Sequence, residues 1–89
     1  MASVKLEGTF DAQGQSEVVR VREWFNLSLS GTFDATIAAE RSFDAGVTWV
    51  EVEAFTGKVE RRGYETEDLL YRLNCTQYTS GTVLYRISR

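Results

Sequence analysis

Two groups of acidic residues are the part of this sequence best suited to acid–base chemistry. Glu51 and Glu53 lie two positions apart, so on an extended strand their side chains share one face. Glu65, Glu67 and Asp68 form the second group. Paired carboxyls hydrolyse glycosidic bonds when ~5–9.5 Å separates them in a sugar-binding cleft. A chain of 89 residues has little room for such a cleft, so we interpret both groups as solvated surface that also discourages edge-to-edge strand association.

Other catalytic and metal-binding chemistry finds little support in the residue types present. The sequence contains no histidine, which excludes Ser-His-Asp and Cys-His nucleophile systems and removes a usual zinc ligand. The second acidic group offers oxygen ligands for Ca²⁺, but without the spacing of a dedicated calcium loop. Cys75 falls on the apolar side of a predicted strand, which favours a buried, unreactive thiol. We therefore expect no enzyme activity, no metal site and no cofactor.

Three aromatic residues lie outside the regular apolar pattern and are candidates for ligand binding. Trp24 falls on the polar side of a predicted strand, whereas Tyr64 and Tyr78 lie in segments rich in turn residues. An exposed aromatic ring on a β-sheet can stack on a sugar ring or contact a partner protein. Packing in the core or at its rim is the commoner fate of such residues, and the sequence leaves these alternatives open.

The composition indicates one small, ordered domain that spans residues 1–89. Five Phe, four Tyr and two Trp supply an apolar core, which argues against disorder. The net charge of −3 argues against binding to nucleic acid through phosphate contacts. No apolar run approaches the ~18 residues of a membrane helix, and the first residues lack the apolar region of a signal peptide. We expect a protein that is made in a cytoplasm and does not bind membranes.

Alternation of apolar and polar residues dominates the chain and predicts about seven short strands. The clearest strands are predicted at residues 17–30, 32–41, 48–54, 69–78 and 82–88. Residues 56–68 are predicted to be mostly loop, and residues 1–16 to be a short strand or an N-terminal arm. Two residues interrupt the alternation, because Glu23 falls on the apolar side and Trp24 on the polar side. This interruption predicts a bulge or bend there. These features predict an all-β, antiparallel fold: a small sandwich, immunoglobulin-like or jelly-roll, or a small barrel.

The best-specified turn lies between two of these strands and contains Ser42, Asp44, Gly46, Thr48 and Trp49. Asp44 can accept hydrogen bonds from backbone N–H groups just after it, and Gly46 can adopt a positive φ. The spacing of the five residues resembles the Asp-box hairpin of sialidases and of many unrelated β proteins. In those families the box is a structural corner and not the catalytic site, so the resemblance implies a scaffold role.

Two stretches on either side of this hairpin extend the resemblance. They are residues 25–33, FNLSLSGTF, and residues 71–82, YRLNCTQYTSGT. Together with the hairpin they are similar to small virion structural proteins of tailed bacteriophages, over most of residues 25–88. The resemblance implies a role in assembly: decorating a capsid, forming a head spike or fibre, or lying at the neck or tail.

The resemblance leads us to expect a capsid decoration (cement) protein that acts by binding alone. Its expected partners are the major capsid protein or other virion proteins, and its expected form is a homo-oligomer, with a trimer favoured. The expected location is the virion, after synthesis in the host cytoplasm. The candidate contact residues are Val4, Leu6, Trp24 and Tyr64. The alternative is a carbohydrate- or receptor-binding module of a fibre, spike, neck or tail, whose affinity for glycans would depend on Trp24 or Tyr64.

Overall fold

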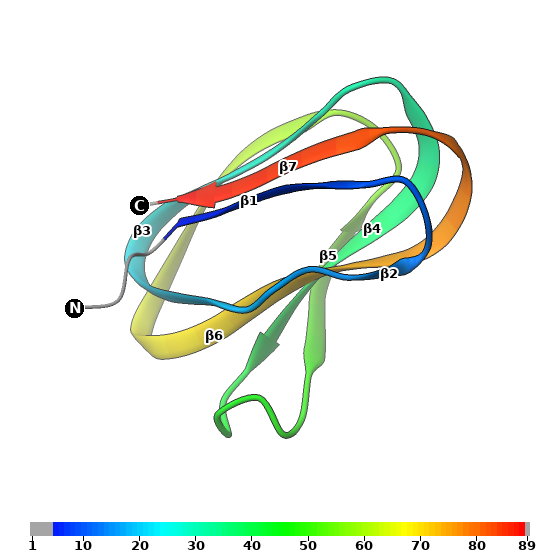
Figure 1. Cartoon of the computed structure of the whole chain (residues 1–89). Coiled ribbons are helices and arrows are strands. Elements are labelled where there is room, and N and C mark those ends of the chain that lie inside the picture. The colour runs from blue at the N-terminus through cyan, green and yellow to red at the C-terminus, as the bar shows by residue number, and fades with distance from the viewer. Residues whose placement is uncertain (1–4, 89) are drawn as a thin grey trace.

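Antiparallel strands make up all the regular structure of the described part of the chain. The computed structural model describes residues 5–88, and Figure 1 shows the arrangement of its strands. The strands are β1 (Lys5–Phe10), β2 (Gly14–Gln15), β3 (Val19–Ser30), β4 (Phe33–Ser42), β5 (Val50–Phe55), β6 (Val59–Gly81) and β7 (Val83–Ser88). The predicted all-β, antiparallel class and the number of strands are confirmed. Residues 5–88 contain no helix that could cross a membrane.

The seven strands form a single sheet that folds over its own core. The strand order is β1-β7-β3-β6-β4-β5, and β2 lies beside β6. The long strand β6 belongs to both halves of the sheet, because its first part pairs with β3 and its second part pairs with β4. The two halves enclose the core between them (Figure 1). The architecture is therefore sandwich-like, with both layers drawn from one sheet that does not close.

One continuous cluster of apolar side chains fills the interior. Its least accessible members come from four different strands, and they are Val21, Leu29, Ile37, Leu73, Cys75, Val83 and Ile87. Each occupies an inward position of an alternating strand, as the period of two requires. Burial of the Cys75 thiol raises its pKa, because the low-polarity surroundings disfavour the thiolate. The predicted buried cysteine is therefore confirmed.

The prediction that residues 56–68 are mostly loop is wrong from Val59 onward, whereas residues 56–58 do connect β5 to β6 outside any strand. The strand β6 begins at Val59 and continues for 23 residues. After Val59, which packs against the core, the next inward positions are Arg61, Gly63 and Glu65, so the apolar alternation that marks a strand in the sequence is missing there. The glycine is required because a Cβ atom at this position would collide with the ring of Phe25. The charged side chains are accommodated by ion pairs with other strands.

The interpretation of residues 1–16 as an arm is wrong for the described part of this segment. The strand β1 pairs with β7 along its whole length, and β2 pairs with β6. Leu6 lies opposite Ile87 and is only 5% exposed, because it points into the core. It is therefore a core residue and not a contact residue for a partner. Val4 lies outside the described residues.

The predicted bulge in β3 is confirmed. The register of β3 against β6 shifts between Val21 and Glu23. Glu23 adopts a φ of 62°, in the left-handed region that residues with side chains rarely occupy. One residue of β3, Arg22, stands there against three residues of β6, 66–68. The parity of β3 is unchanged, so Phe25 still points into the core and Trp24 points outward.

Candidate functional site

The hairpin between β4 and β5 is held by hydrogen bonds among the Asp-box residues. The buried hydroxyl of Ser42 accepts from the backbone N–H of Gly46 at 2.8 Å and of Asp44 at 3.3 Å. The same hydroxyl donates to Asp44 Oδ1 at 2.7 Å. That carboxylate oxygen also accepts from the Thr48 N–H at 2.8 Å, and Trp49 Nε1 donates to the Gly46 carbonyl at 3.1 Å. All five residues of the motif therefore take part in one network.

Electrostatics and backbone conformation also fix the end of this hairpin. Hydrogen bonds from the Thr48 backbone and the Ser42 hydroxyl lower the pKa of Asp44 to about 2. Ala45 and Gly46 both adopt positive φ angles, which makes the reversal tight. The guanidinium of Arg72 lies 4.3 Å from the ring centre of Trp49 and ties the hairpin to β6. These contacts join the turn residues to one another and to β6, as a structural corner would require.

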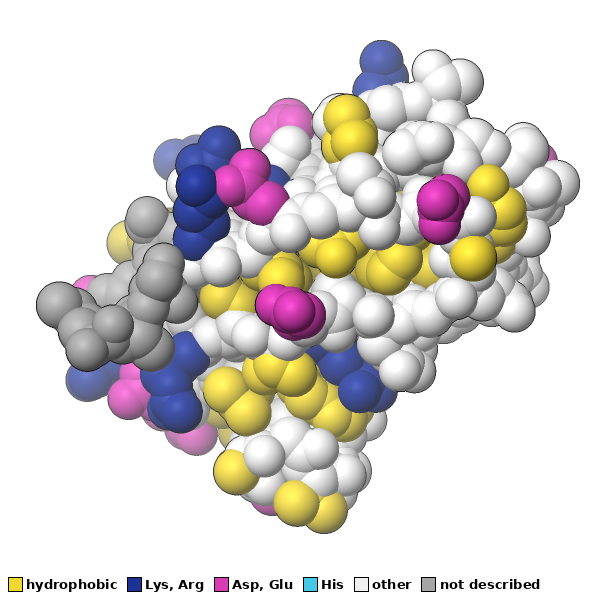
Figure 2. Space-filling model, viewed as in Figure 1, with side chains coloured by type: hydrophobic (Ala, Val, Ile, Leu, Met, Phe, Trp, Pro, Cys, Tyr) yellow, Lys and Arg dark blue, Asp and Glu magenta, His cyan; other side chains and the backbone are white. Residues whose placement is uncertain are grey.

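This scaffold presents an exposed apolar surface that the sequence did not reveal. We call it the hairpin patch, and it consists of Phe43, Val47, Val50 and Val52. Val47 is 82% exposed and Phe43 is 58% exposed. The hairpin projects from the body of the protein, and apolar side chains cover its end (Figures 1 and 2). Exposed apolar surface of this kind often marks a site of protein interaction.

The acidic pair on β5 does not form a shared carboxylate site. Glu53 lies opposite Ala39, whereas Glu51 lies opposite Glu40. Because successive residues of β4 face opposite sides, the two carboxylates also face opposite sides. A register shift between Ala39 and Glu40 causes this arrangement, and the prediction that Glu51 and Glu53 share one face is wrong.

The second acidic group is likewise divided. Glu67 and Asp68 are exposed, whereas the Glu65 side chain is only 12% exposed and forms an ion pair with Arg41 at 2.7 Å. Glu65 also accepts a hydrogen bond from the Tyr71 hydroxyl. Burial and the neighbouring carboxylate raise the pKa of Tyr71 above its ordinary value. Glu65 is thus engaged in a structural ion pair, and residues 5–88 contain no cluster of ligands suited to a metal ion.

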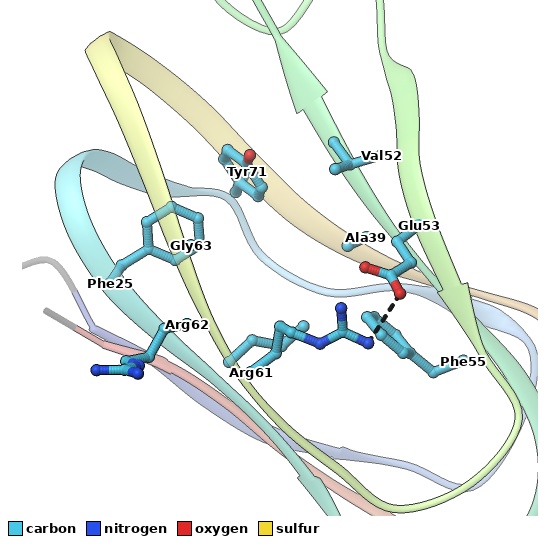
Figure 3. A pocket seen from close by; sticks show the side chains of 10 residues that line it. Phe25, Ala39, Val52, Glu53, Phe55, Arg61, Arg62, Gly63 and Tyr71 are labelled. Atoms are coloured by element: carbon cyan, nitrogen blue, oxygen red, sulfur yellow. Dashed lines mark ion pairs between the residues drawn. The ribbon is translucent and has the colours of Figure 1, made fainter.

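A small hollow lies between β5 and the first part of β6 (Figure 3). Its volume is about 140 Å³, and Phe25, Phe55 and Tyr71 supply much of its lining. Arg61 lies across it and pairs with Glu53 at 2.9 Å. Sites for small molecules usually enclose ~300–1,000 Å³. The hollow is therefore a gap at the open seam of the sheet and is too small for a sugar cleft between carboxylates.

Two of the predicted contact residues, Trp24 and Tyr64, lie together on the surface. They are opposite one another on β3 and β6. Their ring centres are 4.9 Å apart at an interplanar angle of 66°, the edge-to-face arrangement that aromatic pairs favour. Trp24 is 63% exposed and Tyr64 is about half exposed. The third candidate, Tyr78, lies apart from this pair, partly buried against the core, and its hydroxyl donates a hydrogen bond to the Gly81 carbonyl.

The polar residues beside this aromatic pair were missed by the sequence reasoning. Asn26 lies opposite Arg62, in the next outward positions along β3 and β6. Because residues 56–68 were predicted to be mostly loop, the sequence could not assign Arg62 to the outward face of a strand. Asn26 could have been identified from the sequence, because polar residues predominate at alternate positions of residues 17–30 and so mark the outward face of β3.

No protein-family model, curated protein or solved structure matches this chain. The fold therefore defines its class: a small, antiparallel, sandwich-like β domain. Two exposed surfaces, the hairpin patch and the face around Trp24, are the features from which its function can be argued.

Proposed function

We propose that this protein is a non-enzymatic structural component of a tailed-bacteriophage virion, and that it is a capsid decoration protein that binds and stabilises the assembled head. The proposed partner is the major capsid protein, and the proposed location is the virion, after synthesis in the host cytoplasm. The resemblance of residues 25–88 to phage virion proteins supports this proposal. The observation that carries it is the hairpin patch, an apolar surface held rigid by the Asp-box network.

The size of the hairpin patch suits a weak contact that is repeated many times. Its four side chains are about half exposed or more, and burying them would contribute roughly 4–7 kcal/mol before the costs of association. A rigid hairpin loses little conformational freedom on binding, which preserves more of this energy. One such contact is modest, but many copies on a lattice act together.

Stabilisation of the head would follow from selective binding. A protein that binds the assembled shell and not its separate subunits shifts the assembly equilibrium towards the shell. A homo-oligomer would strengthen this effect, because each oligomer would contact several capsid subunits at once. We favour a trimer for this reason, and no catalytic step is required.

The copy number of the protein in purified virions tests this proposal. Quantitative mass spectrometry should find on the order of hundreds of copies per particle, as expected for sites repeated over an icosahedral shell. About six or twelve copies would instead indicate the neck or the tail. Absence from the particles would overturn the proposal.

A pair of surface variants tests the role of the hairpin patch. Val47→Asp places a charge at the centre of the proposed contact and should abolish co-sedimentation with purified capsid shells. Leu84→Asp is the matched control, because Leu84 is an exposed apolar residue on β7, away from the hairpin. Equal binding by both variants would show that the hairpin patch is not the contact.

A further inference from the structure

The outward face of β6, β3 and β7 carries a regular array of side chains that the hairpin patch does not use. Along β3 its outward positions are Trp24, Asn26 and Ser28, and on β6 the residues opposite them are Tyr64, Arg62 and Glu60. On β7, Ser88 lies opposite Asn26 and Arg86 lies opposite Ser28. We call these eight residues the outer face. At ~3.3 Å per residue, the array extends ~13 Å from Trp24 to Ser28.

One end of the outer face is aromatic. The edge-to-face pair of Trp24 and Tyr64 leaves most of the indole surface accessible. Trp24 occupies an outward position of β3 directly after Glu23, whose backbone is left-handed. Residues held in such rare conformations are often found at functional sites. The exposed indole offers a flat apolar surface to a ligand.

The rest of the outer face is polar and hollowed. A hollow of about 340 Å³ is lined by Trp24, Phe25, Asn26 and Arg62. A second hollow of about 320 Å³ is lined by Asn26, Ser28, Glu60, Arg86 and Ser88. Asn26 lines both, so the two open hollows adjoin, and the volume of each lies in the size range of small-molecule sites. Amide, hydroxyl, carboxylate and guanidinium groups provide it with both hydrogen-bond donors and acceptors.

The charge of the outer face is opposite to that of the whole molecule. Arg62 and Arg86 outnumber the single acidic residue, Glu60, which accepts a hydrogen bond from Ser28 at 2.6 Å. Within residues 5–88, Arg62 makes no ion pair. A planar guanidinium next to an aromatic ring suits a ligand that carries a carboxylate, because it can form two parallel hydrogen bonds with that group.

We propose that the outer face binds an acidic oligosaccharide. One sugar ring stacks on Trp24, its carboxylate pairs with Arg62, and hydroxyl groups of the neighbouring sugar bond to Asn26, Ser28 and Glu60. A nucleic acid would need more than two basic residues to neutralise its phosphates. A protein partner would need a larger apolar centre than one aromatic pair supplies. A flat apolar ring beside closely spaced hydrogen-bond donors and acceptors therefore favours a carbohydrate ligand.

Isothermal titration calorimetry with defined sugars tests this proposal. Sialyllactose and digalacturonate are the acidic probes, and lactose is the neutral probe. At least one acidic probe should bind, and lactose should bind about tenfold more weakly or not at all, since it lacks the charged hydrogen-bond partner of Arg62. Trp24→Ala and Arg62→Gln should each lower the affinity for the acidic probe about tenfold.

Circular dichroism of the variants, a control variant on the hairpin patch and a capsid-shell binding assay complete the test. Trp24 and Arg62 are both exposed, so circular dichroism of their variants should match that of the parent protein. Phe43→Ala removes an exposed aromatic ring from the hairpin patch instead, and its sugar affinity should be unchanged. Absence of binding to both acidic probes, equal binding of lactose, or unchanged affinity in the two variants would overturn the proposal. Loss of capsid-shell binding in Trp24→Ala, without sugar binding by the parent, would assign the outer face to a protein contact and also overturn it.

Discussion

Replacing Ser42 by Ala should destabilise the protein by removing the centre of the hairpin network. The Ser42 hydroxyl accepts two backbone N–H groups and donates to Asp44, and the residue is only 2% exposed. After the change, the Gly46 N–H loses its 2.8 Å partner. The Asp44 carboxylate retains the Thr48 N–H but loses the hydroxyl. The variant leaves the fold of the core untouched, so its effect reports on the hairpin.

The size of this effect follows from the lost hydrogen bonds. A hydrogen bond contributes ~0.5–1.5 kcal/mol to stability, and Ser42 makes three that the partly exposed turn can partly replace with water, so we take ~2 kcal/mol for Ser42→Ala. For a domain of 60–100 residues, each kcal/mol lowers the melting temperature by ~4–8 °C. The expected fall is therefore ~8–16 °C. Thermal unfolding followed by circular dichroism, together with urea titration at constant m-value, measures it.

Ser80→Ala is the matched control for this measurement. Ser80 is an exposed serine on β6, and its free energy of unfolding should change by less than ~0.5 kcal/mol on substitution. If Ser42→Ala fell within the same limit, the hydrogen bonds of the Asp-box residues would not be what holds the hairpin. That outcome would refute the scaffold role and weaken the argument that the hairpin patch is rigid.

Two further predictions concern charge and packing. The pKa of Asp44 is lowered in the folded protein from 3.8 to about 2, so its stabilising effect is present above pH ~4 and is lost as the pH falls towards 2. The difference in melting temperature between the parent and Asp44→Asn, measured from pH 7 to pH 2, should therefore narrow below pH ~4, and a constant difference would contradict this assignment. Gly63→Val should destabilise the protein by ~1–3 kcal/mol in urea titrations, because the added atoms collide with the Phe25 ring. Gly57→Ala is its control, since a Cβ atom there meets open space, and equal costs for both changes would refute the packing argument.

Local features of this fold were predictable from the sequence. The hairpin network depends on residues within seven positions of one another, so the spacing of Ser42, Asp44 and Gly46 specified it. The irregularity near Glu23 was predictable because Glu23 and Trp24 interrupt an alternation that extends on both sides of them. Each of these features leaves its signature in one short stretch of chain.

The features that were missed depend on residues distant in the sequence. The first part of β6 has charged or small inward residues, and these are compatible with a strand only because other strands supply partners. Arg61 pairs with Glu53, Glu65 pairs with Arg41, and Gly63 makes room for a ring on β3. The strand β1 was partly misread as an arm for the same reason, since it pairs with β7 at the other end of the chain. A single sequence does not specify such pairings.

The two proposed surfaces belong to different strands, so a substitution in one surface should leave binding by the other unchanged. The hairpin patch lies on β5 and on the turn between β4 and β5, whereas the outer face lies on β6, β3 and β7. A protein fixed to a capsid through the hairpin patch would keep the outer face free for a ligand outside the particle. Val47→Asp should then abolish shell binding and retain sugar affinity, while Trp24→Ala should do the reverse. If either variant removed both activities, with its fold intact by circular dichroism, the two surfaces would act as one site and the separation inferred from the strand order would be wrong.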